Sequence, residues 1–444
     1  MEIAELAVKK ALNFGATEAE AYVQKTKTLW IEFAEKIESL KTIESIGLGL
    51  RVAINKKVAI HSASILSEEE AEKAAEKAVK IAKVASEDPD WKNLNKKFGK
   101  SSAEGFFDDE LEKLDYSEIV ERLTSAIEKI IEYDKRVKPT RGLLTTSIVD
   151  TVIANNYGEE NERKETYLAA WMRAKAEEGG EKSTGTEDCE TKFYKEMKLE
   201  EMAEKAAEKA VKFLKAKPIE SGEIPVIIRN KVFANILGVI LSGPLNADWV
   251  QKGRSPLSNK IGAQIASQNI NLVDDGTMHG GWRTRPFDDE GHPTQKTILI
   301  ENGVLRNYLY DTYTALKNNV ESTGNAYRRQ YWMPPQPFPS NLVLNPGTSS
   351  PEEIMGETKR GVFVEDTIGE WLSNPVSGNL NATITHGYLI ENGDLVKPIK
   401  GVVISGNFYE LLKNGIELVG NDLRNSMQNY SPTVKLSKIT IAGK

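Results

Sequence analysis

The densest group of polar side chains in the sequence lies between residues 274 and 292. In chain order it includes Arg285, Asp288, Asp289, Glu290 and His292. Carboxylates beside an arginine could organise a hard cation or hold the charged ends of a peptide. Consecutive acids before a glycine are also common turn chemistry. A structural turn and a binding role are therefore both open for this segment.

Two histidines, His279 and His292, flank the same carboxylates. Their spacing matches neither a zinc finger nor an EF-hand loop. A metal-dependent hydrolase that uses both histidines with Asp288–Glu290 is one alternative function. The pair Gly47 and Gly49 lacks the third glycine of a dinucleotide loop and leads into a strand, so we interpret it as close packing in a sheet.

The chain also contains a helix-length segment without catalytic side chains. Residues 232–243, VFANILGVILSG, are apolar on all sides, which indicates a helix buried in protein. The segment is shorter than the roughly 20 residues needed to cross a bilayer. It has no His, Cys, Asp or Glu, although the loops around it have the layout of an active site.

Composition limits the classes of partner. The 444 residues carry 65 acidic and 58 basic side chains, for a net charge of -7, and no long basic block. Because non-specific nucleic-acid binding depends on neutralising phosphates, we expect no nucleic-acid partner. Cys189 is the one cysteine and has acidic neighbours, so we expect an inert thiol. The start of the chain has no signal-peptide pattern, and we expect a cytoplasmic protein without a membrane partner.

The periodicity of the sequence predicts an α+β protein with two domains. Residues 1–217 read as helix, strands and helix, repeated once, with strands near residues 29–33 and 45–54. The decapeptide AEKAAEKAVK occurs at both 71–80 and 203–212, which favours an internal duplication. Residues 218–444 read as a mainly β, barrel-like domain around the buried helix. Two Asn-Gly pairs, at 302–303 and 392–393, predict tight hairpins there.

Eight short motifs together resemble one known family over nearly the whole chain. They are Gly47-Leu48-Gly49-Leu50-Arg51, Lys252-Gly253-x-Ser255, Asp274-Asp275-Gly276, Arg285-Pro286-Phe287-Asp288-Asp289-Glu290-Gly291, Ile300-Glu301-Asn302-Gly303, Ser322-Thr323-Gly324-Asn325, Asn374-Pro375-Val376-Ser377-Gly378 and Val419-Gly420-Asn421-Asp422. In this order they resemble the TldD/PmbA family, once called modulators of DNA gyrase.

The resemblance implies a missing metal site. In TldD-type members a helix bears H-E-x-x-x-H, which with a distal cysteine holds zinc and supplies the base. The matching positions here are Gly238, Val239 and Gly243, and no cysteine follows Asp422. The chain therefore resembles the PmbA (TldE) type, with no catalytic residue and no metal or cofactor of its own. The resemblance implies that a TldD-type partner supplies zinc in a heterodimer that cleaves unfolded or extended peptides.

Substrate contacts are expected from the polar segment and from a later loop. We predict Arg285, Asp288, Asp289, Glu290, Asn325 and Arg328 as substrate-binding residues. An extended peptide could be held by strand addition at a sheet edge beside them. A homodimeric peptide-binding module is a further alternative, in which the partner is a second copy of the chain.

Overall fold

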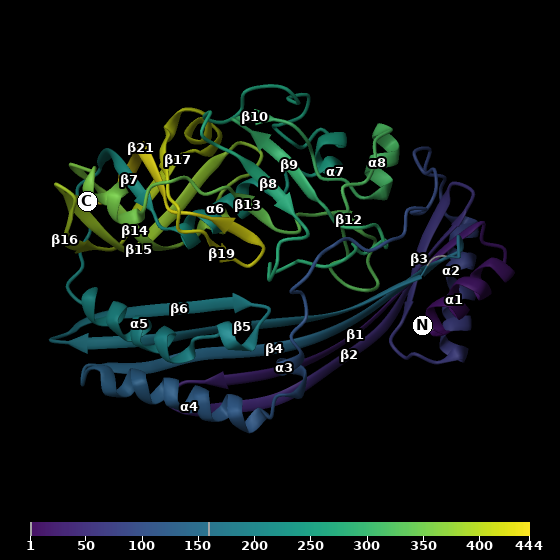
Figure 1. The fold of residues 1–444 in the computed structure, drawn as a ribbon, viewed down its shortest axis with the longest axis horizontal. Helices are drawn as coiled ribbons and strands as arrows, with labels where there is room; N and C mark the ends of the chain where they lie inside the picture. The colour runs from purple at the N-terminus through teal and green to yellow at the C-terminus, as the bar shows by residue number, and fades with distance from the viewer. Residues whose placement is uncertain (1, 159) are drawn as a thin grey trace.

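The first half of the chain forms one long antiparallel sheet with helices on one side (Figure 1). The computed structural model describes residues 2–158 and 160–444. The first unit consists of α1 (Glu2–Asn13), β1 (Glu18–Phe33), β2 (Ile37–Ile54), β3 (Lys57–Ala63) and α2 (Glu68–Val84). The second consists of α3 (Asp109–Lys113), α4 (Tyr116–Tyr133), β4 (Val137–Asn155), β5 (Glu160–Glu178), β6 (Glu181–Thr191) and α5 (Leu199–Lys212).

The strand order confirms the predicted repeat of helix, strands and helix. The order is β3-β2-β1-β4-β5-β6, so the first strands of the two units pair at the centre of the sheet. The two copies of AEKAAEKAVK lie in α2 and α5, the last helices of their units. The repeated decapeptide therefore occupies equivalent places in the two units.

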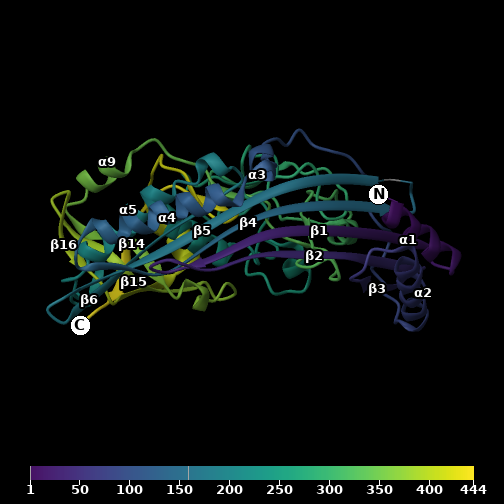
Figure 2. The same ribbon diagram turned by 90° about the horizontal axis from the view of Figure 1, so that it is seen from below.

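Alternation along the strands divides the long sheet into two faces. Ala21 and Ile31 of β1 are fully buried against helices, Ala21 in the cluster that contains α1 and α2 and Ile31 in the one that contains α4. Side chains of opposite parity, such as Glu20 and Tyr22, point to the other face because neighbouring residues of a strand alternate. The second half of the chain covers that other face (Figures 1 and 2).

The second half contains a closed barrel and a second sheet. The barrel strands are β7 (Gly222–Ile228), β14 (Arg360–Ile368), β15 (Asn379–Glu391), β17 (Val402–Asn407) and β21 (Val434–Ala442). The barrel closes because β15 pairs with both β17 and β14. The second sheet has the order β10-β9-β8-β13-β20-β19, and its members are β8 (Leu272–Asp275), β9 (Lys296–Glu301), β10 (Val304–Leu305), β13 (Leu342–Leu344), β19 (Arg424–Ser426) and β20 (Asn429–Ser431).

The predicted buried helix is α6 (Asn230–Leu241), which lies in the core between the barrel and the second sheet. It contacts β14 of the barrel and β19 and β20 of the sheet. Phe233, Ile236 and Ile240 are almost completely buried in one apolar cluster with barrel residues. The structure therefore confirms a mainly β second half organised around an apolar helix.

Both predicted Asn-Gly hairpins are present. Asn302 and Gly303 have φ of 48° and 77°, and Asn392 and Gly393 have φ of 50° and 87°. Two consecutive positive φ angles are those of a type I′ turn, which matches the twist of the flanking strands. The predicted domain boundary at residue 217 falls between α5 and β7. Among the described residues, no helix combines the length and apolar character needed to cross a bilayer.

Candidate functional site

The predicted polar segment lies where the long sheet meets the second half of the chain. There, charged side chains from both halves form a buried cluster, the interdomain network. Its members from the sheet are Glu20, Arg51, Arg163 and Glu165, and its members from the second half are Arg285, Asp288, Asp289, Glu290 and Arg328. Each of these nine residues is less than a tenth exposed, so every charge needs a partner within the protein.

Asp289 connects three arginines. One carboxylate oxygen lies 2.5 Å from Nη2 of Arg163 and 2.8 Å from Nη1 of Arg285. The other accepts the backbone N–H of Arg328 at 2.8 Å. Burial alone would raise the pKa of Asp289, but Arg285 and Arg163 outweigh it and hold the pKa at about 2. Asp289 is therefore held in its charged form, and both of its oxygens accept hydrogen bonds from within the protein.

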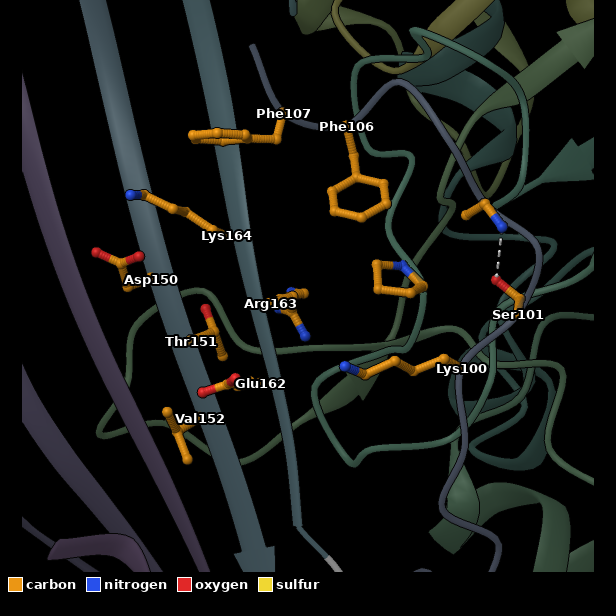
Figure 3. Close-up of a pocket in the computed structure, with 12 residues that line it drawn as sticks. Lys100, Ser101, Phe106, Phe107, Asp150, Thr151, Val152, Glu162, Arg163 and Lys164 are labelled. Atoms are coloured by element: carbon orange, nitrogen blue, oxygen red, sulfur yellow. Dashed lines mark hydrogen bonds between the residues drawn. The ribbon is translucent and has the colours of Figure 1, made fainter. Parts of the chain in front are cut away.

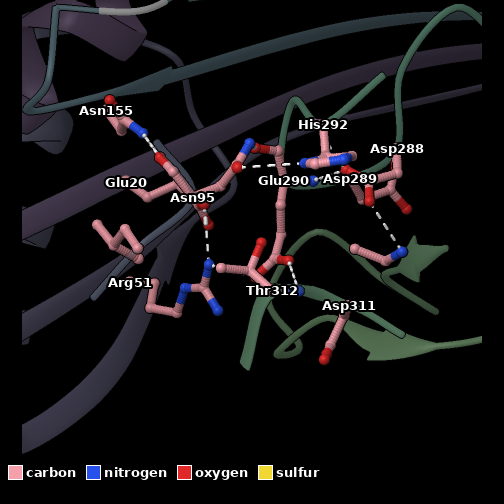
Figure 4. Close-up of polar contacts among 12 residues, drawn as sticks. Glu20, Arg51, Asn95, Asn155, Asp288, Asp289, Glu290, His292, Asp311 and Thr312 are labelled. Atoms are coloured by element: carbon pink, nitrogen blue, oxygen red, sulfur yellow. Dashed lines mark hydrogen bonds and ion pairs between the residues drawn. The ribbon is translucent and has the colours of Figure 1, made fainter. Parts of the chain in front are cut away.

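Glu290 connects the network to Arg51 of β2 and to the backbone of Thr312 (Figure 4). Its Oε1 lies 2.8 Å from Nη2 of Arg51, and its Oε2 accepts the backbone N–H of Thr312 at 2.8 Å. Arg51 also pairs with Glu20 at 2.9 Å, and Glu20 in turn pairs with Arg328. The side chains of β1 and β2 are thus tied to two separate loops of the second half.

Asp288 holds its own loop together. It accepts backbone N–H groups from Glu290, His292 and Ala326 at 2.9–3.0 Å. Burial beside the charged Glu290 raises the pKa of Asp288. A carboxyl group that accepts bonds from its own turn has a structural role of the kind that acidic turn residues commonly have.

Asn325 contacts a further buried acid, Asp274 on β8. Its Nδ2 donates to Oδ2 of Asp274 at 2.6 Å. Burial raises the pKa of Asp274 to about 7. The other oxygen of Asp274 has no hydrogen-bond partner among the described residues. This pair fixes the loop before β11 (Ala326–Tyr327) to the second sheet but has no opening to solvent, since both residues are 1% exposed.

The structure therefore brings together five of the six predicted substrate residues in the network and places Asn325 beside it. Their burial favours the structural alternative for the segment 285–290, and their contact with a peptide stays a prediction. Sequence reasoning missed the partners on the sheet. For Glu20 and Arg51 the available signal was a charged residue among apolar neighbours in a strand, but Arg163 and Glu165 lie in the wholly polar stretch 160–166 and gave no such signal.

The two histidines do not converge on the carboxylates. His279 stacks on Phe193 with ring centroids 5.7 Å apart. His292 is buried, and its Nδ1 lies 3.5 Å from Oδ1 of Asn95 (Figure 4). Within residues 2–158 and 160–444, no three His, Cys, Asp or Glu side chains are grouped so that they could hold a metal ion.

The space beside α6 is filled where the family motif would place zinc ligands. A β-carbon on Gly238 would lie 2.1 Å from Nδ2 of Asn429, and one on Gly243 would lie 2.8 Å from the ring of Trp249. Zinc sites need about three protein ligands and an open position for water. Neither glycine has a donor atom in its side chain, Val239 packs against the apolar core, and the neighbouring side chains occupy the volume. These residues do not fit a zinc ion.

One cavity of about 690 Å³ lies beside β4 and β5 (Figure 3). Phe106 and Phe107 of the connecting segment form one wall, and Asp150 and Lys164 of the strands form another. Of the network, only Arg163 reaches its lining. The cavity mixes apolar and oppositely charged groups and presents no nucleophile with an adjacent base.

Three family models cover most of the chain. They are described as PmbA/TldA metallopeptidase domain 1, central domain and C-terminal domain, and they match residues 19–82, 109–214 and 221–443. An uncharacterised protein of Methanocaldococcus jannaschii is 30% identical over 400 residues, which are 90% of each chain. A metalloprotease PmbA homologue of Haemophilus influenzae is 25% identical over 443 residues, which are 98% of this chain and 94% of that one.

Solved structures share the same fold over the full length. TldE of Thermococcus kodakarensis superposes with a TM-score of 0.92 at 25% identity, over 99% of this chain and 100% of that one. A Thermotoga maritima protein, named for a proposed role as a modulator of DNA gyrase, superposes with a TM-score of 0.89 at 27% identity, over 99% of both chains. The chain belongs to the PmbA/TldD family of metallopeptidases.

Proposed function

We propose that this chain is the subunit without metal in a two-subunit metallopeptidase of the TldD/TldE type. In this proposal a TldD-type partner supplies the zinc ion and the general base. The combined enzyme cleaves unfolded or extended peptides. The observation that carries the proposal is the pair Gly238 and Gly243 on α6, where Asn429 and Trp249 fill the space that zinc ligands would need.

Two further observations support this role. The fold is similar to that of TldE from Thermococcus kodakarensis over its full length. Asp289 and Glu290 of the interdomain network are also buried and pair with arginines of the same network, so these two carboxylates are engaged within the protein. Hydrolysis of a peptide needs an activated water and stabilisation of the developing oxyanion, and a zinc ion provides both. A chain that lacks that ion and its base would contribute shape and substrate contacts.

Reconstitution tests the proposal directly. The purified chain, a purified family member that bears H-E-x-x-x-H, and their mixture are each assayed on an unfolded peptide, with metal content measured in parallel. We expect cleavage only in the mixture and zinc only in the partner. The control mixture contains a partner in which the motif glutamate is replaced by glutamine. Cleavage by this chain alone, or partner activity that is the same with and without it, would refute the proposal.

A further inference from the structure

The edge of β5 that faces away from β4 is unpaired over its first residues. β5 pairs with β4 from residue 160 on, but its ladder with β6 begins only at Leu168. The N–H of Thr166 donates to the carbonyl oxygen of Phe106 at 3.1 Å, so the backbone groups of Thr166 point away from β4. Because this direction alternates along a strand, the N–H and C=O groups of Glu162 and Lys164 also point away from β4. Among the described residues, none of these four groups has a hydrogen-bond partner.

The connecting segment between the two units, residues 85–108, runs beside this edge without closing it. The segment is tied to β5 at two points. At one, Nδ2 of Asn161 donates to the carbonyl oxygen of Gly99 at 3.1 Å, and at the other Thr166 bonds to Phe106. The two points are about 17 Å apart along the strand. A length of extended chain therefore separates the two ties, and over that length no backbone hydrogen bond joins the segment to β5.

Contacts with the second half of the chain hold the middle of the segment away from β5. The N–H of Ser101 donates to the carbonyl oxygen of Pro286 at 2.8 Å. Gly105 has φ of 71° and packs so closely on the second half that a β-carbon there would lie 2.8 Å from the backbone nitrogen of Gly280. A residue with a side chain would be strained at this φ and would also clash. The gap between the segment and β5 is therefore built into the fold.

The cavity of about 690 Å³ occupies this gap (Figure 3). Its lining includes Lys100 and Phe106 of the segment and Glu162 and Lys164 of β5, and its volume lies within the range of about 300–1,000 Å³ that is typical of ligand sites. The charged side chains of the lining have both signs, since Lys100 and Lys164 are accompanied by Asp150 and Glu162. Side-chain charge therefore selects no class of ligand. The unpaired backbone groups do, because they are complementary to the backbone of an extended chain.

We propose that this cavity binds an extended peptide as an added strand on β5. The peptide backbone bonds to the N–H and C=O groups of Glu162 and Lys164, and an apolar side chain of the peptide packs on the rings of Phe106 and Phe107. Recognition through the backbone does not depend on sequence, as the binding of unfolded peptides requires. The inference rests on the proposed function for its class of ligand, and it gives that ligand a position on the subunit without metal.

Peptide binding by the chain alone tests the proposal. The probe is a fluorescein-labelled pentapeptide with a central phenylalanine, and fluorescence anisotropy follows its binding without any partner subunit. Two further versions carry N-methyl groups on alternate backbone amides, one on the odd-numbered and one on the even-numbered amides. The version whose methylated amides face β5 loses its donors and should bind about tenfold more weakly, while the other should bind about as well as the unmethylated probe. Equal weakening of both versions, or no binding of the unmethylated probe, would overturn the proposal.

Two proline variants locate the site. Glu162→Pro removes an N–H that faces the cavity but leaves the ladder with β4 intact, so it should weaken probe binding by about fivefold or more. Glu160→Pro is the matched control, because residue 160 has the same orientation in β5 but lies outside the cavity lining. Phe106→Ala keeps the backbone bond to Thr166 and removes the apolar wall, and it should also weaken binding. Urea unfolding verifies that each variant is folded. Unchanged binding by folded Glu162→Pro or Phe106→Ala would contradict the assignment of the site.

Hydrogen exchange distinguishes the peptide from the alternative occupant, which is the connecting segment itself. The amides of Glu162 and Lys164 should exchange rapidly in the free chain and at least about tenfold more slowly with the probe bound. Protection of these amides without the probe would mean that the segment already pairs with β5, and the proposal would be wrong. All these tests use the chain alone. Their failure would leave the reconstituted peptidase unaffected, and failure of the reconstitution would leave peptide binding by this chain intact.

Discussion

Nη2 of Arg51 lies 2.8 Å from Oε1 of Glu290, although the two residues are 239 positions apart in the sequence. The arginine is on β2 of the long sheet, and the glutamate is in a loop of the second half. Both side chains are almost completely buried, at 5% and 1% exposed. Two halves that could each form a core are therefore joined by a charged contact that water does not reach.

Arg51→Met should destabilise the protein strongly. The substitution leaves Glu290 without a cationic partner and leaves Glu20 paired with Arg328 only. Removing one partner of a buried ion pair lowers the free energy of unfolding by about 3–5 kcal/mol. Urea unfolding measures the loss. Lys80→Met, which removes an exposed i,i+4 pair with Glu76, is the control and should have little effect. Adding Glu290→Gln to Arg51→Met should recover part of the loss, and no recovery would mean that the pair is not coupled.

Asp274→Asn should change how stability depends on pH. Burial raises the pKa of Asp274 to about 7 in the folded protein, against about 3.9 in an unfolded chain. Between these values the folded state keeps a proton that the unfolded state has lost, so the wild type loses stability as pH rises from about 4 to about 7. The asparagine variant lacks this loss.

The measurement is the difference in unfolding free energy between Asp274→Asn and wild type at several pH values. As pH rises from about 4 to about 7, the variant should become more stable relative to the wild type, by as much as about 4 kcal/mol. Asp394→Asn, at an exposed position of β16 (Asp394–Ile399), is the control and should show a constant difference. A constant difference for Asp274→Asn would mean that its carboxyl group ionises normally in the folded state.

Local sequence signals predicted the elements better than the contacts between them. The Asn-Gly hairpins and the apolar helix α6 follow from the conformations that their own residues favour, so periodicity and turn chemistry were sufficient. The strands of the long sheet extend well beyond the predicted segments. β1 continues between residues 23 and 29 through Lys25 and Lys27, because its partners β2 and β4 hold both edges of a polar stretch. The β-propensity of a strand's own residues does not show which other strands will pair with it.

The interdomain network itself was not predicted, for a similar reason; its members in the second half were predicted as substrate-binding residues. The acids and arginines of the second half are close in sequence and could be recognised as a group. Their partners, such as Arg163, are 126 positions away from Asp289, and only the fold brings them together. Whether a carboxylate is saturated or free to bind depends on those distant partners. The sequence could therefore identify the segment but could not decide between a turn and a binding site.

Cys189 should react slowly with thiol reagents. Burial and the neighbouring Glu190 raise its pKa to about 11, so the thiolate that reacts is scarce at neutral pH. At about pH 8 we expect modification on the order of a hundredfold slower than for a free thiol. Urea should remove the protection, and the rate in urea is the internal control. Fast modification of the folded protein would contradict the predicted inertness.

Introducing the family's zinc motif should not create a metal site in this chain. The triple variant Gly238→His, Val239→Glu, Gly243→His supplies two ligands and a base, but the new side chains would overlap Asn429 and Trp249. Overpacking a close-packed core costs about 1–3 kcal/mol or more for each such change, so the variant should unfold at lower urea concentration. Adding Asn429→Ala and Trp249→Ala makes room, and zinc binding by equilibrium dialysis then separates the two causes. If only the five-substitution variant binds zinc, the filled space excludes the ion. If the triple variant already binds zinc tightly, the packing around α6 does not prevent metal binding, and the absent ligands alone distinguish this chain from its metal-binding relatives.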